Sequence, residues 1–246
     1  MSFDNYKEKY LKYKNKYINL KNMQIGGVEG DLIDLIVNKK PSIEIINYIN
    51  NNPESIKEKT DKGLLPLSMA IGLKLPIDVI LKLLEIYPDA AREKTDKGKL
   101  PLFHSIVSES PIEVILKLLE INPDAAREKT DKGVLPVSTA IASKLPIDVI
   151  LKLLEIYPDA AREKTDKGVL PLFHSIVFKS PIEVISKLLE IYPEAVNEKT
   201  KTNLLPIDLA IGENMSNDII KKLIPTDEKL LKPEYEVYRN ISKKII

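Results

Sequence analysis

The chain has 246 residues, of which 43% are hydrophobic and 30% are charged, with 37 lysines and arginines against 36 aspartates and glutamates. It contains no cysteine, which excludes disulfides, thiolate zinc sites and a cysteine nucleophile and fits a reducing compartment. No run of 18 apolar residues is present, so no membrane-spanning helix is expected, and a net charge of +1 argues against a duplex-DNA-binding protein, which needs a basic face.

Residues 1–27 differ in charge from the rest of the chain. They carry six lysines against two acidic residues, so the remainder of the chain sums to −3. Tyr6 is followed by three more tyrosines at steps of 4, 3 and 4, which would form one aromatic stripe on a lysine-rich helix. Three interpretations remain open: a helix that docks on the repeats or on itself, an address for a virion or membrane surface, and a leader cleaved after Gly26 and Gly27.

This N-terminal segment also has a family likeness. The pattern Y-L-K-Y-K-x-K-Y, which begins at Tyr10, is similar to a short segment near the start of many proteins of mimivirus-like giant DNA viruses of amoebae. The resemblance covers about 25 residues. It implies a viral protein that lies in the host cell cytoplasm or in the virion, and the charged N-terminus lacks the apolar core of a secretory signal.

A repeat of 35 residues occupies most of the chain. The hexapeptide EKTDKG begins at positions 58, 93, 128 and 163, and a degenerate copy, EKTKTN, begins at 198. A second period, two units long, lies beneath it, because residues 77–107 and 147–177 are identical at 30 of 31 positions. Such repetition is typical of an extended stack of similar units, whereas a catalytic pocket is built once.

Within one unit we expect a helix, a turn, a second helix and a loop. In residues 65–98, Pro66 fits the first position of the first helix, and Pro76 and Pro88 bound the second helix. Gly98 fits the last position of a type I turn in the loop. This charged loop is interpreted as a solvated turn at the edge of the stack, with a dedicated contact loop as the alternative.

The second helix is aliphatic on most of its circumference. Asp78, Lys82 and Glu85 form its one polar stripe, and the first two are spaced to pair across a turn. Such a helix must be covered on both flanks, so one unit is not expected to fold alone. In the next unit, Ser110 and Glu113 have the spacing of a capping box.

The segment DKGLLPLSMAIGLKLPIDVILKLLE resembles the ankyrin repeat, whose usual form is D-x-x-G-x-T-P-L-H-x-A-A followed by a second helix that ends in L-L. The likeness covers about residues 30–225 and implies an all-α solenoid of stacked helix-turn-helix repeats, about six units in all. Leu65 and Ser68 replace the usual Thr and His, so leucine packing must compensate for hydrogen bonds made there. The unit is two residues longer than usual, and YPDAA predicts a short turn started by proline.

Three regions follow from this interpretation: a basic aromatic tail over 1–27, a repeat domain over 28–225 and a C-terminal capping helix over 226–246. The repeat units are expected near 30–64, 65–99, 100–134, 135–169, 170–204 and 205–225.

The ankyrin resemblance also suggests which residues contact a partner. The variable position after the L-P-L-x run would face a concave groove, and it holds Met69, His104, Thr139, His174 and Leu209. The loops between units would present lysines as fingers, namely Lys97, Lys99, Lys132 and Lys167. The alternative is that the groove positions are ordinary exposed or half-buried helix residues.

Nothing in the sequence predicts catalysis or a cofactor. His104 and His174 lie two repeat units apart and have no cysteine or carboxylate motif beside them, so no metal site is expected. His104 and Ser105 would diverge on a helix, which argues against a Ser-His-Asp arrangement, and no phosphate-binding glycine loop occurs.

We therefore expect a monomeric, non-enzymatic scaffold that binds a host or viral protein along the concave face of the solenoid. A virion or viral-factory structural component anchored by the tail is the alternative. A substrate adaptor for host ubiquitin ligases is a third hypothesis, disfavoured because the segment that follows Pro225 is too short for a ligase-binding box.

Overall fold

The computed structural model describes residues 31–60, 63–95 and 97–240. The N-terminal tail over 1–27, including Gly26 and Gly27, lies outside the described residues, as does the end of the expected C-terminal helix over 241–246.

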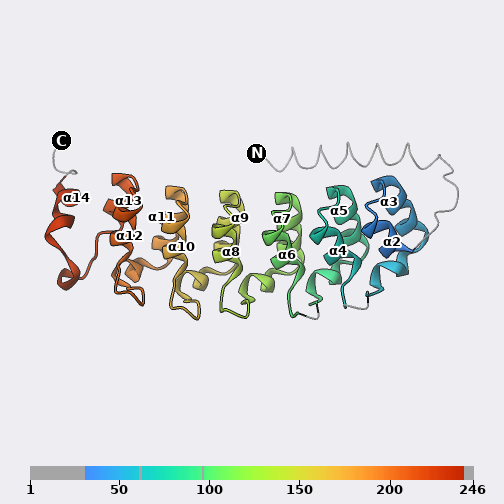
Figure 1. The fold of residues 1–246 in the computed structure, drawn as a ribbon, viewed down its shortest axis with the longest axis horizontal. Helices are drawn as coiled ribbons and strands as arrows, with labels where there is room; N and C mark the ends of the chain where they lie inside the picture. Colours follow the sequence, from blue (N-terminus) through green and yellow to red (C-terminus); the bar gives the residue numbers. More distant parts are fainter. Residues whose placement is uncertain (1–30, 61–62, 96, 241–246) are drawn as a thin grey trace.

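Six similar helical units stand in one row (Figure 1). Their first helices are α2 (Leu32–Val37), α4 (Pro66–Gly72), α6 (Pro101–Val107), α8 (Pro136–Ala142), α10 (Pro171–Val177) and α12 (Pro206–Gly212). Their second helices are α3 (Ser42–Asn51), α5 (Ile77–Ile86), α7 (Ile112–Ile121), α9 (Ile147–Ile156), α11 (Ile182–Ile191) and α13 (Asn217–Lys222). No strand occurs among the described residues, so the expected all-α solenoid is confirmed.

A short 3₁₀ helix follows the second helix in each of the first five units. These helices are η1 (Pro53–Lys57), η2 (Pro88–Arg92), η3 (Pro123–Arg127), η4 (Pro158–Arg162) and η5 (Pro193–Asn197). Each begins at a proline, whose fixed φ suits the first helical position and whose missing N–H leaves no donor unsatisfied. The expected proline-started turn at YPDAA is thus confirmed.

Each first helix from α4 onward begins at a proline preceded by a buried leucine. Leu65, Leu100, Leu135, Leu170 and Leu205 occupy the N-cap position, and each is at most 6% exposed. Leucine packing therefore does replace the polar contacts that a threonine would make there. Removal of each leucine from water stabilises the unit by roughly 2 kcal/mol.

The start of the second helices differs from the sequence-based expectation. Pro111 takes the N-cap position of α7, and no side chain caps the helix. Ser110 lies one residue outside, and its amide donates a hydrogen bond to the Ser105 carbonyl over 2.9 Å. The expected capping box of Ser110 and Glu113 was wrong, because the extended backbone of Pro111 moves the serine away from the helix end.

The polar stripe of the second helix also pairs differently. The Lys82 amine lies 3.4 Å from Glu85, three residues on, whereas Asp78 accepts a hydrogen bond from the Ser42 hydroxyl over 3.1 Å and one from the amide of Val79. The expected pair between Asp78 and Lys82 does not form, because neighbouring groups engage this carboxylate at the start of the helix.

The core runs along the row of helices. Each second helix from α5 to α9 buries four aliphatic residues, represented in α5 by Val79, Ile80, Leu83 and Leu84. Each first helix from α4 to α10 contacts the first helices of the units on both sides. Each second helix from α5 to α11 likewise contacts the second helices on both sides, which confirms that neighbours cover both flanks of this aliphatic helix.

The last unit is closed by a segment outside the repeat. It contains η6 (Glu228–Leu230), η7 (Pro233–Tyr235) and α14 (Glu236–Asn240), and α14 contacts α13. Tyr235 is 1% exposed, and its hydroxyl donates a hydrogen bond to Asp208 on α12. The same carboxylate accepts hydrogen bonds from the Lys232 amine at 2.8 Å and from the amide of Leu205 at 3.0 Å.

Candidate functional site

The five groove positions form one row. Met69, His104, Thr139, His174 and Leu209 each occupy the fourth position of their first helix, and each is half-buried. Met69 and Leu209 pack partly against the core, while the Thr139 hydroxyl donates to the Leu135 carbonyl over 3.2 Å. Because neighbouring first helices are in contact, the row exposes part of each of these five uncharged side chains, one for each unit.

The two histidines of the row are half-buried and lie near aromatic rings. His104 lies edge-on to Phe103 with the ring centroids 6.1 Å apart, and His174 lies 6.4 Å from Phe178. One ring nitrogen of each, Nε2 of His104 and Nδ1 of His174, is buried and has no hydrogen-bond partner among the described residues. Burial lowers the pKa of both imidazoles, and the nearby Lys99 lowers that of His104 further.

The loops between units form tight fingers. The Gly98 amide donates to the Thr95 carbonyl over 2.7 Å, and the Thr95 amide donates to the Lys99 carbonyl over 3.0 Å. Gly98 has a φ of +66°, which only glycine adopts without strain. The expected turn from Thr95 to Gly98 is therefore present. It brings the flanking chains together and presents Lys97 at its exposed tip.

The finger lysines fall into two groups. Lys97, Lys132 and Lys167 are exposed at successive tips, and none is in an ion pair within the described part of the chain. Lys99 instead lies 3.1 Å from Asp131 of the next finger and 5.2 Å from the centre of the Phe103 ring. Three of the four predicted lysines are thus available to a partner, and Lys99 joins two units.

A ladder of ion pairs between units was missed by the sequence analysis. The lysine of each EKT triplet pairs with the glutamate of the next triplet. The pairs are Lys59–Glu93 (3.0 Å), Lys94–Glu128 (2.8 Å), Lys129–Glu163 and Lys164–Glu198 (2.8 Å). The sequence did contain a signal for these pairs, because each lysine and its partner glutamate are 34 residues apart, one residue less than the repeat length. The charged loop is therefore more than a solvated turn, because it also links the units.

Further charges on this edge are engaged by the stack. Arg92 donates to the carbonyl of Ile121 over 2.7 Å at the C-terminal end of α7, where unpaired helix carbonyls accept a cation well. Arg162 donates in the same way to Ile191 over 2.9 Å. The Tyr192 hydroxyl donates to Glu198 over 2.8 Å. The two arginine contacts connect neighbouring units, whereas the tyrosine contact lies within one unit, and together they leave few of the loop charges free.

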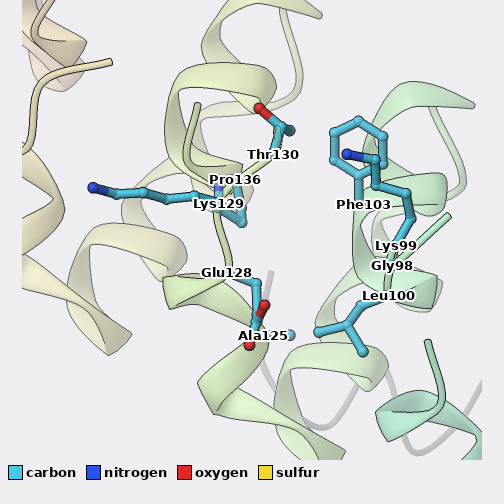
Figure 2. A pocket seen from close by; sticks show the side chains of 9 residues that line it. All are labelled: Gly98, Lys99, Leu100, Phe103, Ala125, Glu128, Lys129, Thr130 and Pro136. Atoms are coloured by element: carbon cyan, nitrogen blue, oxygen red, sulfur yellow. The ribbon is translucent and has the colours of Figure 1, made fainter. Parts of the chain in front are cut away.

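One small recess lies between two fingers (Figure 2). It is lined by Gly98, Lys99, Leu100, Phe103, Ala125, Glu128, Lys129, Thr130 and Pro136. Its volume of about 20 Å³ is enough for a single water molecule and too small for an organic ligand. Within residues 31–60, 63–95 and 97–240, no group of three or more His, Asp or Glu side chains is placed to hold a metal ion. No helix in those ranges is long and apolar enough to cross a membrane.

Comparison with known proteins supports the fold alone. No protein-family model matches the sequence, and no curated protein matches it. The fold itself is widespread, with 267 matching chains among solved structures. One belongs to the complex of a predatory endopeptidase from Bdellovibrio bacteriovorus with an immunity protein. It has a TM-score of 0.61 and 16% identity, and the match covers 80% of this chain and 98% of that chain. At this identity the likeness concerns architecture and does not carry an activity across.

Proposed function

We propose that the protein is a non-catalytic scaffold that binds another protein through the groove row and the fingertip lysines. The observation that carries the proposal is the contrast between two sets of surface groups. Among the described residues, most loop charges are paired between units, whereas Lys97, Lys132 and Lys167 form no ion pair, and the groove row adds uncharged, half-buried side chains. A rigid row of repeated contacts lowers the entropic cost of binding, because the surface is preorganised.

An ankyrin-like identity of the solenoid belongs to the same proposal. It is supported by the L-P-L sequence at the first helix, by the glycine turn of the first four fingers and by the pairing of a short first helix with a longer second one. One solved structure that shares the fold comes from a complex of two proteins, which is the setting expected for an interaction module.

A viral origin, with a location in the host cytoplasm or in the virion, is proposed on the N-terminal Y-L-K-Y-K-x-K-Y segment. The same segment favours the second candidate function, a virion or viral-factory structural component anchored by residues 1–27. Quantitative mass spectrometry of purified particles distinguishes the two candidates. High abundance in particles supports the structural component, and presence only in host cytoplasm supports the scaffold.

The scaffold proposal is tested by capture of partners from infected cells with tagged protein. One variant carries alanine at the five groove positions. The matched control carries alanine at four lysines of the opposite helix layer, Lys82, Lys117, Lys152 and Lys187, which pair only within their own helices. We expect the groove variant to lose its partner and the control to keep it. Equal capture by both variants contradicts the groove assignment, and repetition without residues 1–27 isolates the contribution of the tail.

A further inference from the structure

The last residue of each first helix alternates between a valine and a small residue. Along the row these residues are Val37, Gly72, Val107, Ala142, Val177 and Gly212. We call them the end row. The three valines are 52%, 53% and 47% exposed, and together they are most of the large hydrophobic side chains exposed in the described ranges. The two-unit period of the sequence thus appears on the surface as exposed valine side chains that alternate with small residues.

The glycines of the end row have no explanation within a single chain. Gly72 and Gly212 lie in helices, and neither has a positive φ. A Cβ atom added to either would meet no atom of the described residues within 4 Å. Glycine in a helix lowers stability relative to alanine, so an open position of this kind gains nothing from it. Glycine is useful at such a place when another backbone or side chain approaches closely.

We propose that a second copy of this chain docks on the end row in antiparallel orientation, related by a two-fold axis between α6 and α8. In a two-fold interface, residue i of one copy faces residue j of the other, and j faces i. Reversal of the end row brings Val37 opposite Gly212, Gly72 opposite Val177 and Val107 opposite Ala142. Every valine then faces a small residue, because the row alternates and has an even number of positions.

The residues beside the end row are complementary in the same register. One position further along, half-buried Leu73 faces half-buried Phe178, and Ser108 faces Ser143. These contacts place apolar groups on apolar groups near the ends of the row and hydroxyls on hydroxyls near its centre.

Charges also match at the centre of the proposed interface. Two positions beyond the end row, Glu109 faces Lys144 on both sides of the axis. Both are exposed, and neither is in an ion pair within the chain as described. Toward the ends Lys74 faces Lys179, but Glu213 lies 3.4 Å from Lys179 and offsets that charge. A central pair of opposite charges fixes the register, since like charges in contact are unfavourable.

The length of the row sets the expected strength of association. Six helices packed at roughly 8–10 Å spacing give a row about 40–50 Å long. One narrow stripe of that length lies near the lower limit of about 1,200 Å² for specific interfaces. We therefore expect a reversible dimer with a dissociation constant on the order of 10–100 µM.

The test is sedimentation equilibrium of the full chain. We expect the average mass to rise from 27.8 kDa toward twice that value over the concentration range from about 1 µM to about 500 µM. Glu109→Lys and Lys144→Glu each weaken the association by about tenfold, because each creates two like-charge contacts. The double variant restores it. Lys152→Glu, on the second-helix face, is the matched control and leaves association unchanged.

A second pair of substitutions tests the role of the glycines in the end row. Gly72→Val and Gly212→Val together place valine against valine, so we expect self-association to be lost while the unfolding transition of the monomer is not lowered. A mass of 27.8 kDa at every concentration overturns the proposal. Association that the single charge variants do not weaken overturns it equally. The measurement contains no partner protein, so its failure is distinct from failure of the proposed scaffold function.

Discussion

Removal of the Tyr235 hydroxyl should loosen the C-terminal closure of the solenoid. The Tyr235 ring is buried, and its hydroxyl donates to the Asp208 carboxylate, which also receives Lys232 and the Leu205 amide. Tyr235→Phe keeps the packed ring and removes one hydrogen bond to a charged acceptor. Because two other donors still satisfy the carboxylate, we expect a loss of about 1–2 kcal/mol in the free energy of unfolding.

The same contact predicts a dependence on alkaline pH. Burial and the hydrogen bond to Asp208 raise the pKa of Tyr235 to about 12, from an ordinary value near 10. A raised pKa means that the folded chain holds this proton more tightly than the unfolded chain. The stabilisation is complete below about pH 10 and is lost as pH rises through about 12, by about 3 kcal/mol at most.

The two effects are measured by urea unfolding of the wild type and of Tyr235→Phe from pH 8 to about 12, with hydrogen exchange to locate the change. The pKa of Lys232 is raised by Asp208 and also by Tyr235, so the difference between the curves reports Tyr235 together with its effect on Lys232. Amides of α12 and α13 should exchange faster in the variant, and those of α4 to α7 should not. Equal stability at pH 8, with unchanged exchange in α12, would refute the closure argument.

Two further predictions concern the fingers and the histidines. Gly98→Ala should lower the free energy of unfolding by about 1 kcal/mol, from its positive φ alone. Gly133→Ala should lower it more, because the new Cβ would lie 2.5 Å from a carboxylate oxygen of Asp166 and 3.0 Å from its backbone nitrogen. Thermal unfolding of the two variants measures the difference, and equal losses of stability contradict the prediction. Burial lowers the pKa of His104 and His174, so the unfolded chain takes up protons first as pH falls below about 6.5, and the free energy of unfolding should drop there. Replacement of both histidines by glutamine should flatten this acid slope in urea titrations at pH 7.5 and 5.5, and an unchanged slope contradicts the assignment.

The solenoid was predictable because its determinants are local and repeated. Pro66 and Pro88 mark the start of the first helix and of the 3₁₀ turn, and the aliphatic second helix requires neighbours on both sides. Predictions from local sequence patterns failed where two groups compete for the same helix end or the same hydrogen-bond partner. Pro111 takes the N-cap that Ser110 was expected to occupy, and Asp78 is engaged by Ser42 of the preceding unit before Lys82 can reach it.

Contacts between units were harder to predict, because they join residues about one period apart. Lys94 and Glu128 pair across neighbouring units, so each partner reads as part of a solvated loop when one unit is considered alone. The closure by Asp208 depends on Lys232 and Tyr235, which lie outside the repeat and have no counterpart in other units. The sequence showed Asp208 as a departure from the repeat, but it did not indicate that Lys232 and Tyr235 would be its partners.

The two-unit period of the sequence connects these observations. Copying of a two-unit block preserves the ladder of ion pairs, because each pair joins adjacent units, and it also multiplies whatever distinguishes the odd units from the even ones. One such difference in this chain is valine against glycine or alanine at the end of the first helix. Alternation in a row with an even number of positions becomes complementary to itself when reversed. A translational duplication can therefore produce a two-fold interface without further selection for one, and its strength should change in steps of two units when blocks are added or removed.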